Sequence, residues 1–206
     1  MKALKGLYIV TPDWDETDRL LVITEKALKG GAALVQYRHK TAAAPQRREQ
    51  AAALQALCRR YGVPFIVNDY VDLCLELDAD GIHVGGTDES VASVRARVGP
   101  DKIVGASCYG EMDLVRGAVG EGASYVAFGG FYPSRIKEYE VTTPARIIGD
   151  AKKELPHVPS CAIGGITLEN AIPLVEQGVD MISVISSVYM ADDPEAAARA
   201  FADLYK

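Results

Sequence analysis

Three polar side chains lie at alternate positions of one apolar segment. Gln36, Arg38 and Lys40 occur in Leu34–Lys40 (LVQYRHK), so they point the same way if the segment is extended. The glutamine lies deepest, and the two cations follow at the end of the segment. Arginine offers a bidentate hydrogen-bond donor and lysine a compact charge, a pair that suits a phosphate ester. The alternative is a solvated strand end, where isolated basic pairs are common.

Acidic side chains end two further apolar segments. Asn68 and Asp69 close FIVND, and Asp88 closes IHVGGTD. Two carboxylates on neighbouring strand tips could be a general acid and base, or they could bind Mg²⁺, which prefers one or two carboxylates plus phosphate oxygens. Basic groups nearby favour ionised carboxylates and hence the metal. Alternatively, Asp88 only caps the helix that starts near Ser90.

Later segments supply glycines and hydroxyls at equivalent places. A long loop, Phe128–Lys137, contains glycines and ends in Ser134, Arg135 and Lys137. Long loops in compact domains are often functional. The sequence IGGI contains Gly164 and Gly165, and Ile185, Ser186 and Ser187 follow the last apolar segment. Backbone amides after the last two strands of a strand–helix barrel commonly hold phosphate.

These residues together suggest two anion sites. One would be built from Arg38, Lys40, Lys137 and a metal, and the other from glycine amides and Ser186. An enzyme that joins two phosphorylated substrates would need both sites.

Alternating strands and helices must position these residues. Val/Ile/Leu-rich runs of this kind are typical of buried parallel strands. With Leu7–Val10, the pattern predicts about eight strands and about eight helices in one α/β domain over residues 1–206. We therefore expect a compact (β/α)₈ barrel with the polar residues at the C-terminal ends of its strands, and an open doubly wound sheet is the alternative. The other apolar runs, each given with the polar or glycine cluster that ends it, are Leu34–Lys40, Phe65–Asp69, Ile82–Asp88, Ile103–Ser107, Tyr125–Lys137, Cys161–Ile166 and Met181–Ser187, and the expected helices are Asp18–Lys29, Pro45–Tyr61, Val71–Leu77, Ser90–Val98, Met112–Glu121, Pro144–Leu155, Leu168–Gln177 and Pro194–Tyr205.

Composition excludes several classes of protein. The 206 residues are 49% hydrophobic and 24% charged, with a net charge of −6 and no long run of Lys or Arg, which argues against nucleic-acid partners. No apolar run approaches the ~20 residues that cross a bilayer, and the N-terminus lacks a signal peptide, so no membrane partner is expected. The four cysteines form no CxxC pair, which favours buried, reduced thiols and a cytoplasmic location.

The histidines are weaker candidates for chemistry. His83 lies inside an expected strand and is interpreted as a hydrogen-bonded core residue. His39 alternates with Arg38 and Lys40 and is expected to face outward, and His157 lies in a loop without an evident partner. No Ser-His-Asp, HExxH or GxGxxG arrangement supports a hydrolase or a dinucleotide enzyme.

The segments VQYRHK, FIVNDYVDLCLELDADGIHVGGTD, VGASC, YVAFGGFYPSRIK, CAIGGIT and VISSV resemble, in order and spacing, those of the thiamine phosphate synthase family. The resemblance spans nearly the whole chain. It implies a compact (β/α)₈ barrel that joins hydroxymethylpyrimidine diphosphate to a thiazole phosphate. The products would be thiamine monophosphate and diphosphate, with Mg²⁺ as cofactor.

The resemblance also implies roles for individual residues. Asp69 and Asp88 would bind Mg²⁺, and Arg38, Lys40, Ser107 and Lys137 would be catalytic. The pyrimidine diphosphate would contact Gln36, Arg38, Lys40, Asn68, Ser107 and Lys137. The thiazole phosphate would contact Ser134, Gly164, Gly165, Ile185 and Ser186, and Arg135 and Ile136 of the long loop are also expected to bind substrate.

Some positions depart from the pattern of the family. Ile136 stands where Thr or Ser is usual, Gly86 where Gln is common and Tyr109 where many members have His. A related thiazole tautomerase is one alternative function, but it is understood to depend on a histidine at position 109. Another is a sugar-phosphate isomerase or epimerase, which would need an acid/base pair near neutral pH. A catalytically silent binding protein of the thiamine pathway is a further alternative.

Overall fold

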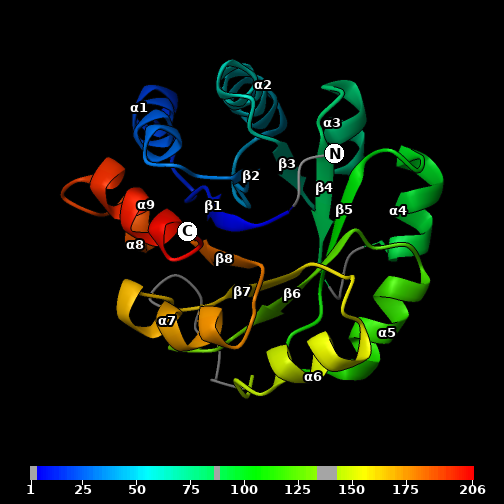
Figure 1. The fold of residues 1–206 in the computed structure, drawn as a ribbon. Helices are drawn as coiled ribbons and strands as arrows, with labels where there is room; N and C mark the ends of the chain where they lie inside the picture. Colours follow the sequence, from blue (N-terminus) through cyan, green and yellow to red (C-terminus); the bar gives the residue numbers. More distant parts are fainter. Residues whose placement is uncertain (1–3, 86–88, 134–142) are drawn as a thin grey trace.

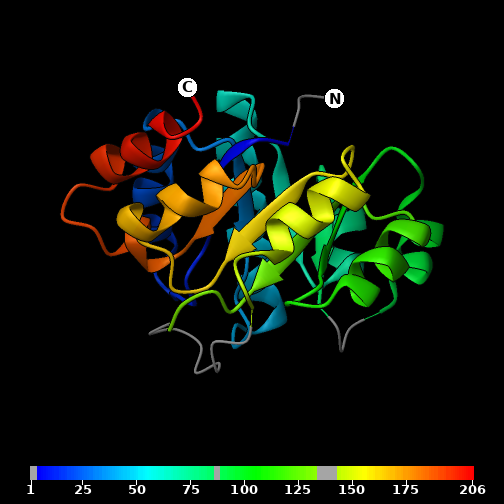
Figure 2. The same ribbon diagram turned by 60° about the horizontal axis from the view of Figure 1, so that its bottom comes forward.

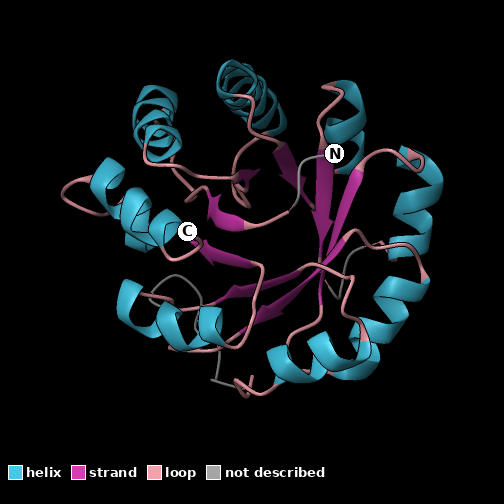
Figure 3. Cartoon of the chain, in the orientation of Figure 1, coloured by secondary structure: helices cyan, strands magenta, loops and turns pink. Residues whose placement is uncertain are grey.

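The computed structural model describes residues 4–85, 89–133 and 143–206. Eight parallel strands form a closed barrel in sequence order, and helices surround it (Figures 1 and 3). The barrel closes because β1 pairs with β8, with Tyr8 opposite Ser183. The predicted (β/α)₈ barrel is confirmed, and the open doubly wound sheet is wrong.

The strands are short and almost wholly buried, as their apolar runs predicted. Figure 2 shows the arrows of β6, β7 and β8 pointing the same way, away from the end of the barrel at which the C-terminus lies. All eight strands are parallel, so their C-terminal ends gather on one face of the barrel. The strands are β1 (Gly6–Val10), β2 (Leu34–Tyr37), β3 (Phe65–Asn68), β4 (Gly81–Val84), β5 (Ile103–Ser107), β6 (Tyr125–Gly129), β7 (Ser160–Ile163) and β8 (Met181–Val184).

The helices lie close to their predicted positions, with two differences. The helix expected over Pro144–Leu155 begins three residues later, and a short helix after β8 was not predicted. The described helices are α1 (Thr17–Lys29), α2 (Ala44–Tyr61), α3 (Val71–Glu76), α4 (Val91–Val98), α5 (Met112–Gly120), α6 (Ile147–Glu154), α7 (Leu168–Glu176), α8 (Ser186–Tyr189) and α9 (Pro194–Asp203).

Local sequence signals set several helix ends. Thr167 caps α7 in a capping box with Asn170, and Pro194 occupies the first turn of α9. The side chain of Ser90 caps α4 by accepting from the amide of Ser93 at 3.2 Å. Asp88, which was considered as an alternative cap, lies outside the described residues.

The core has two layers. The larger layer lies between the strands and the surrounding helices. The smaller one fills the barrel interior, where Tyr8, Leu34, Ile66, Ile103, Tyr125, Ala127, Cys161 and Met181 pack together. This interior layer closes the barrel beneath the C-terminal ends of the strands, so a site at those ends has a solid floor.

Two further predictions concern the whole chain. All four cysteines are free and buried, as expected for reduced thiols. Among the described residues, none of the helices has the length and apolar character needed to cross a membrane.

Candidate active site

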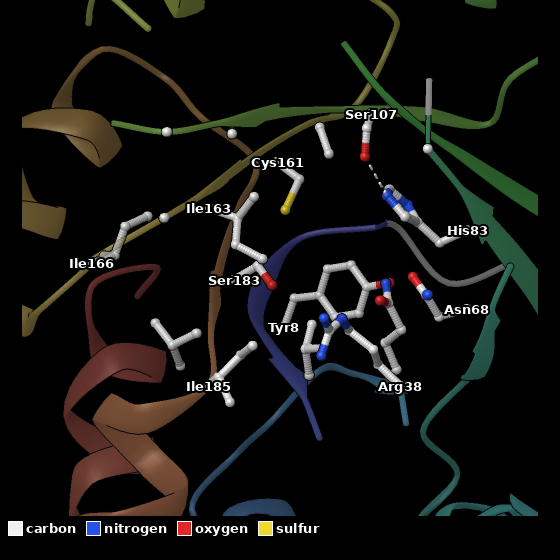
Figure 4. Close-up of a pocket in the computed structure, with 18 of the residues that line it drawn as sticks. Tyr8, Arg38, Asn68, His83, Ser107, Cys161, Ile163, Ile166, Ser183 and Ile185 are labelled. Carbon is white, nitrogen blue, oxygen red and sulfur yellow. Dashed lines mark hydrogen bonds between the residues drawn. The ribbon is translucent and has the colours of Figure 1, made fainter. Parts of the chain in front are cut away.

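A cavity of about 290 Å³ opens at the C-terminal ends of the strands (Figure 4). Every predicted site residue that the structure describes lines it: Gln36, Arg38, Lys40, Asn68, Asp69, Ser107, Gly164, Gly165, Ile185 and Ser186. The predicted residues Asp88, Ser134, Arg135, Ile136 and Lys137 lie outside the described part of the chain. The sequence pattern thus brought residues from β2, β3, β5, β7 and β8 to one place.

Arg38 is held in position from two directions. Its guanidinium donates to both carboxylate oxygens of Asp13, at 3.0 and 3.1 Å. The Thr11 hydroxyl donates to the backbone carbonyl of Arg38 and accepts from its amide. The Arg38 side chain is only 11% exposed, and its Nε is buried without a hydrogen-bond partner among the described residues. A largely buried cation that is held in place at a cavity wall is suited to an anionic ligand.

Asp69 and Lys40 form an ion pair beside this arginine. Lys40 Nζ lies 3.1 Å from Asp69 Oδ2, and the Lys40 amide donates to Asp13 at 2.9 Å. Asp69 has φ of 64°, in the left-handed region, and its amide donates to the carbonyl of His83. Strained backbone of this kind is concentrated at functional sites.

Two glycines allow the loop after β7 to meet the loop after β6. Gly164 and Gly165 have φ of 114° and 60°. A Cβ on Gly164 would come within 2.7 Å of the Gly130 amide nitrogen, and one on Gly165 would lie 2.7 Å from the Tyr132 carbonyl oxygen. Only glycine permits this approach, which is why the double glycine of IGGI occurs here.

The cavity wall has two chemically different sides. In Figure 4, Arg38, Asn68, His83 and Ser107 lie on one side, and Ile163, Ile166 and Ile185 lie on the other. Backbone amides of the glycine loops and the Ser186 hydroxyl add polar groups at the apolar side. A ligand with a strongly anionic part and a flat, less polar part would fit such a wall.

Sequence reasoning missed several residues of the site. Tyr8, His83 and Ser183 line the cavity, and Asp13 supports Arg38 from the loop after β1. Ser183 is 2% exposed, and its Oγ has no hydrogen-bond partner among the described residues. Tyr8, His83 and Ser183 lie on strands whose sequences are mainly apolar, and Asp13 lies in a loop. The available signal was that Tyr8 and Ser183 are polar exceptions in such runs.

The expectations for the histidines are partly corrected. His83 is buried and hydrogen-bonded as expected, through Nδ1 to Tyr125 at 2.9 Å and Nε2 to Ser107 at 3.0 Å, but it also lines the cavity. The expectation that His39 faces outward to solvent is wrong. The His39 side chain is buried, and its Nδ1 accepts from the amide of Ala42 because the loop after β2 folds over it.

Asp69 is the predicted magnesium ligand that lies among the described residues. Asp69 presents a carboxylate to the cavity, and Mg²⁺ commonly takes one or two carboxylates with substrate oxygens and water. Within the ranges that the structure describes, no group of three or more His, Cys, Asp and Glu side chains could hold a metal by itself. Among the described residues, the donor set fits an ion shared with a bound phosphate ester.

Fold and site together define a (β/α)₈ barrel with a cavity, lined by Arg38 and Lys40 among others, at the C-terminal ends of its strands. The profile of the thiamine monophosphate synthase family matches residues 7–188. The chain is 64% identical to the thiamine-phosphate synthase of Janthinobacterium sp. (strain Marseille), covering 98% of this chain and 97% of that protein. It is 46% identical to the thiamine-phosphate synthase of Methylobacillus flagellatus, covering 100% and 97%.

A solved structure agrees with these relatives. The thiamine phosphate pyrophosphorylase from Pyrococcus furiosus superposes with a TM-score of 0.84 at 30% identity, covering 98% of this chain and 96% of that one. The chain belongs to the thiamine monophosphate synthase family.

Proposed function

We propose that the protein is a Mg²⁺-dependent thiamine phosphate synthase. It would join 4-amino-2-methyl-5-hydroxymethylpyrimidine diphosphate to a thiazole phosphate, and release thiamine monophosphate and diphosphate. Membership of the family supports this reaction. The observation that carries the assignment of the site is the largely buried Arg38, held by Asp13, which lines the cavity together with Lys40 and Asp69.

The reaction requires charge stabilisation more than a protein nucleophile. In the proposed step the bond between the pyrimidine methylene carbon and the diphosphate oxygen breaks, and its electron pair leaves with the diphosphate. The thiazole nitrogen then donates its lone pair to the methylene cation. Preorganised cations are the effective catalysts of such a departure, and Arg38 and Lys40 are positioned for this role.

Mg²⁺ would neutralise charge on the departing diphosphate. Asp69 is the described residue placed to hold it, and Asp88, the second predicted ligand, lies outside the described residues. Asn68 and Ser107 would bind the diphosphate side, and Gln36 the pyrimidine. Lys137, also outside the described residues, keeps its predicted role as a contact to the leaving group.

The glycine side of the cavity would hold the thiazole phosphate. Gly164 and Gly165 line the cavity, where their backbone amides could bind a phosphate, and Ser186 adds a hydroxyl beside Ile185. Ser134, Arg135 and Ile136 keep their predicted part in this subsite.

The site supports a synthase better than an isomerase. An isomerase would need a free acid/base pair, but both ring nitrogens of His83 contact protein hydroxyls and Asp69 pairs with Lys40. Burial, reinforced by Asp180, raises the pKa of the Cys161 thiol, which lines the cavity and therefore stays protonated and weakly nucleophilic. The tautomerase alternative is disfavoured by Tyr109 at the cavity wall.

The decisive assay mixes the purified protein with both substrates, with Mg²⁺ or with EDTA, and follows thiamine monophosphate and diphosphate. We expect turnover only with Mg²⁺. Asp69→Asn should lower kcat by about a hundredfold or more, as loss of a charge-stabilising group does. Asp72→Asn is the control, because Asp72 is 95% exposed and pairs with Arg97 outside the cavity. Turnover that persists in EDTA would refute the proposed dependence on Mg²⁺. Absence of product both with Mg²⁺ and with EDTA would refute the proposed synthase activity.

The four free thiols support a reducing compartment, and we propose the cytoplasm as the location. Fractionation of cells expressing the protein, with a compartment marker for each fraction, would test this.

A further inference from the structure

A continuous line of hydrogen bonds crosses the barrel interior and ends at Ser107. Gln36 Nε2 donates to the Tyr8 hydroxyl at 2.5 Å, and the Tyr8 and Tyr125 hydroxyls lie 2.8 Å apart. The Tyr125 hydroxyl lies 2.9 Å from His83 Nδ1, and His83 Nε2 lies 3.0 Å from Ser107 Oγ. We call these five residues the polar relay. It links β2, β1, β6, β4 and β5 in that order.

Strand β5 lies between the strands that carry His83 and Tyr125, and it leaves space for these two rings to meet. In the barrel register His83 lies beside Gly105, and Gly105 lies beside Tyr125. A Cβ at position 105 would collide with the Tyr125 ring. Because Gly105 has no side chain, the Tyr125 ring reaches across β5 and stacks on His83, with ring centroids 5.6 Å apart. The relay therefore depends on the absence of a side chain at position 105.

The direction of each hydrogen bond in the polar relay follows from Gln36, the donor at one end of it. An amide nitrogen can only donate, so the Tyr8 oxygen accepts from Gln36 and its own proton goes to Tyr125. Tyr125 has one proton, which then goes to His83 Nδ1. Burial raises the pKa of both phenols, so both keep their protons. A histidine that accepts at Nδ1 carries its proton on Nε2 and donates it to Ser107 Oγ.

We propose that the polar relay fixes His83 in its Nε2–H form and so makes the Ser107 hydroxyl a hydrogen-bond donor toward the cavity. With its oxygen already accepting from His83, Ser107 has its own proton to give to a ligand. This inference rests on the proposed function, in which that ligand atom is an oxygen of the departing diphosphate. Tyr8, Tyr125 and His83 are then positioning residues, and the donor is oriented before substrate binds.

The first test needs no substrate. The chain has three histidines, so ¹⁵N-histidine labelling gives few ring signals, and His83→Gln assigns those of residue 83. We expect the ¹⁵N shifts of His83 in the unmutated protein to report the neutral Nε2–H form. A neutral Nδ1–H form, or an imidazolium with both nitrogens protonated, would overturn the proposal. The measurement stands whether or not the protein makes thiamine phosphate.

The second test reverses the relay at its start. Gln36→Glu replaces a hydrogen-bond donor by an acceptor of nearly equal size, provided that the introduced carboxyl is ionised. The ¹³C signal of that carboxyl shows whether it is. Every hydrogen bond should then run the other way, and His83 should shift toward the Nδ1–H form. In the Tyr8→Phe background the connection is cut, so the same substitution should leave the His83 signals unchanged. A reversal that fails with Tyr8 present, or persists without it, contradicts the proposal.

The third test measures whether Tyr125 acts on the reaction through Ser107. Tyr125 is fully buried and is not among the residues that line the cavity. Tyr125→Phe should lower kcat by about tenfold and change KM for the pyrimidine diphosphate by less than about threefold. In the Ser107→Ala background it should cost less than about twofold in kcat, because the group it orients is gone. Equal losses in both backgrounds would mean a purely structural role. If Tyr125→Phe does not fold, the tautomer measured in the unmutated protein decides the question.

Discussion

Arg38 and Asp13 form a two-pronged ion pair in which one arginine nitrogen donates to both carboxylate oxygens, at 3.0 and 3.1 Å. The same carboxylate accepts from the Lys40 amide at 2.9 Å. Asp13 lies in the loop after β1, and the two cations follow β2. One acidic residue therefore holds the side chain of Arg38 and the backbone of Lys40, the two residues that are proposed to hold the diphosphate.

Asp13→Asn should weaken this positioning while leaving Arg38 charged. The amide accepts through one oxygen only, so we expect kcat/KM for the pyrimidine diphosphate to fall by about tenfold, equivalent to about 1.4 kcal/mol. Steady-state kinetics with saturating thiazole phosphate measures the change. Asp15→Asn is the matched control, because the Asp15 side chain is 79% exposed in the same loop and does not contact Arg38. Equal losses in both variants would contradict the role of Asp13.

Gly164→Ala should damage the subsite proposed for thiazole phosphate. The added Cβ would meet the Gly130 amide nitrogen at 2.7 Å, and φ of 114° is strained for alanine. We expect KM for thiazole phosphate to rise by about tenfold or more, with a smaller change for the pyrimidine diphosphate. Gly149→Ala in α6 is the control, since nothing lies within 4 Å of a Cβ there. If KM rose selectively for the pyrimidine diphosphate instead, the assignments of the two subsites would have to be exchanged.

Ser183→Ala should stabilise the ligand-free protein. The Ser183 hydroxyl is buried and, among the described residues, unpartnered, and such a group costs roughly 1–3 kcal/mol. We expect the free energy of unfolding to rise by about 1 kcal/mol in urea titrations. Ser160→Ala gives the opposite expectation, because the Ser160 hydroxyl donates to Asp180 at 3.1 Å in an equally buried place. Destabilisation of similar size in both variants would show that Ser183 has a partner.

Stability should fall at alkaline pH because of buried thiols. Burial raises the pKa of Cys58 and Cys108 to about 12, and that of Cys74 to about 11, from the ordinary value of 9.0. Above pH 9 the unfolded chain loses these protons while the folded protein keeps them, so the raised pKa values stabilise the fold below pH 9 and that contribution is lost as pH rises toward 12. Urea unfolding from pH 8 to 10.5 should show the decline, and Cys58→Ala should make it shallower. An unchanged slope in that variant would contradict the assignment.

Local sequence patterns predicted much of the fold and of the site. Strand positions followed from apolar runs because a parallel barrel buries both faces of each strand. Gln36, Arg38 and Lys40 were placed together because alternation along β2 and the residues that follow it puts them on one face. Gly164 and Gly165 were recognised because their positive φ values leave a glycine signature in the sequence.

Contacts between distant strands could not be read in the same way. Tyr8 and Ser183 are neighbours only because β1 pairs with β8, a consequence of closing the barrel. His83 was interpreted as a core residue because its strand is buried, and the partners that bring it into the site come from β5 and β6. Asp13 had no periodic pattern around it, since loop geometry alone brings it to Arg38.

The left-handed backbone conformation of Asp69 lowers the stability of the fold, so selection for thermal stability would act against aspartate at this position. Glycine accepts φ of 64° more readily than aspartate, so Asp69→Gly relieves strain at that residue while deleting the carboxylate proposed to hold the metal. A library screened only for survival on heating would then enrich sequences that no longer turn over substrate. Robustness and catalysis compete for this one position.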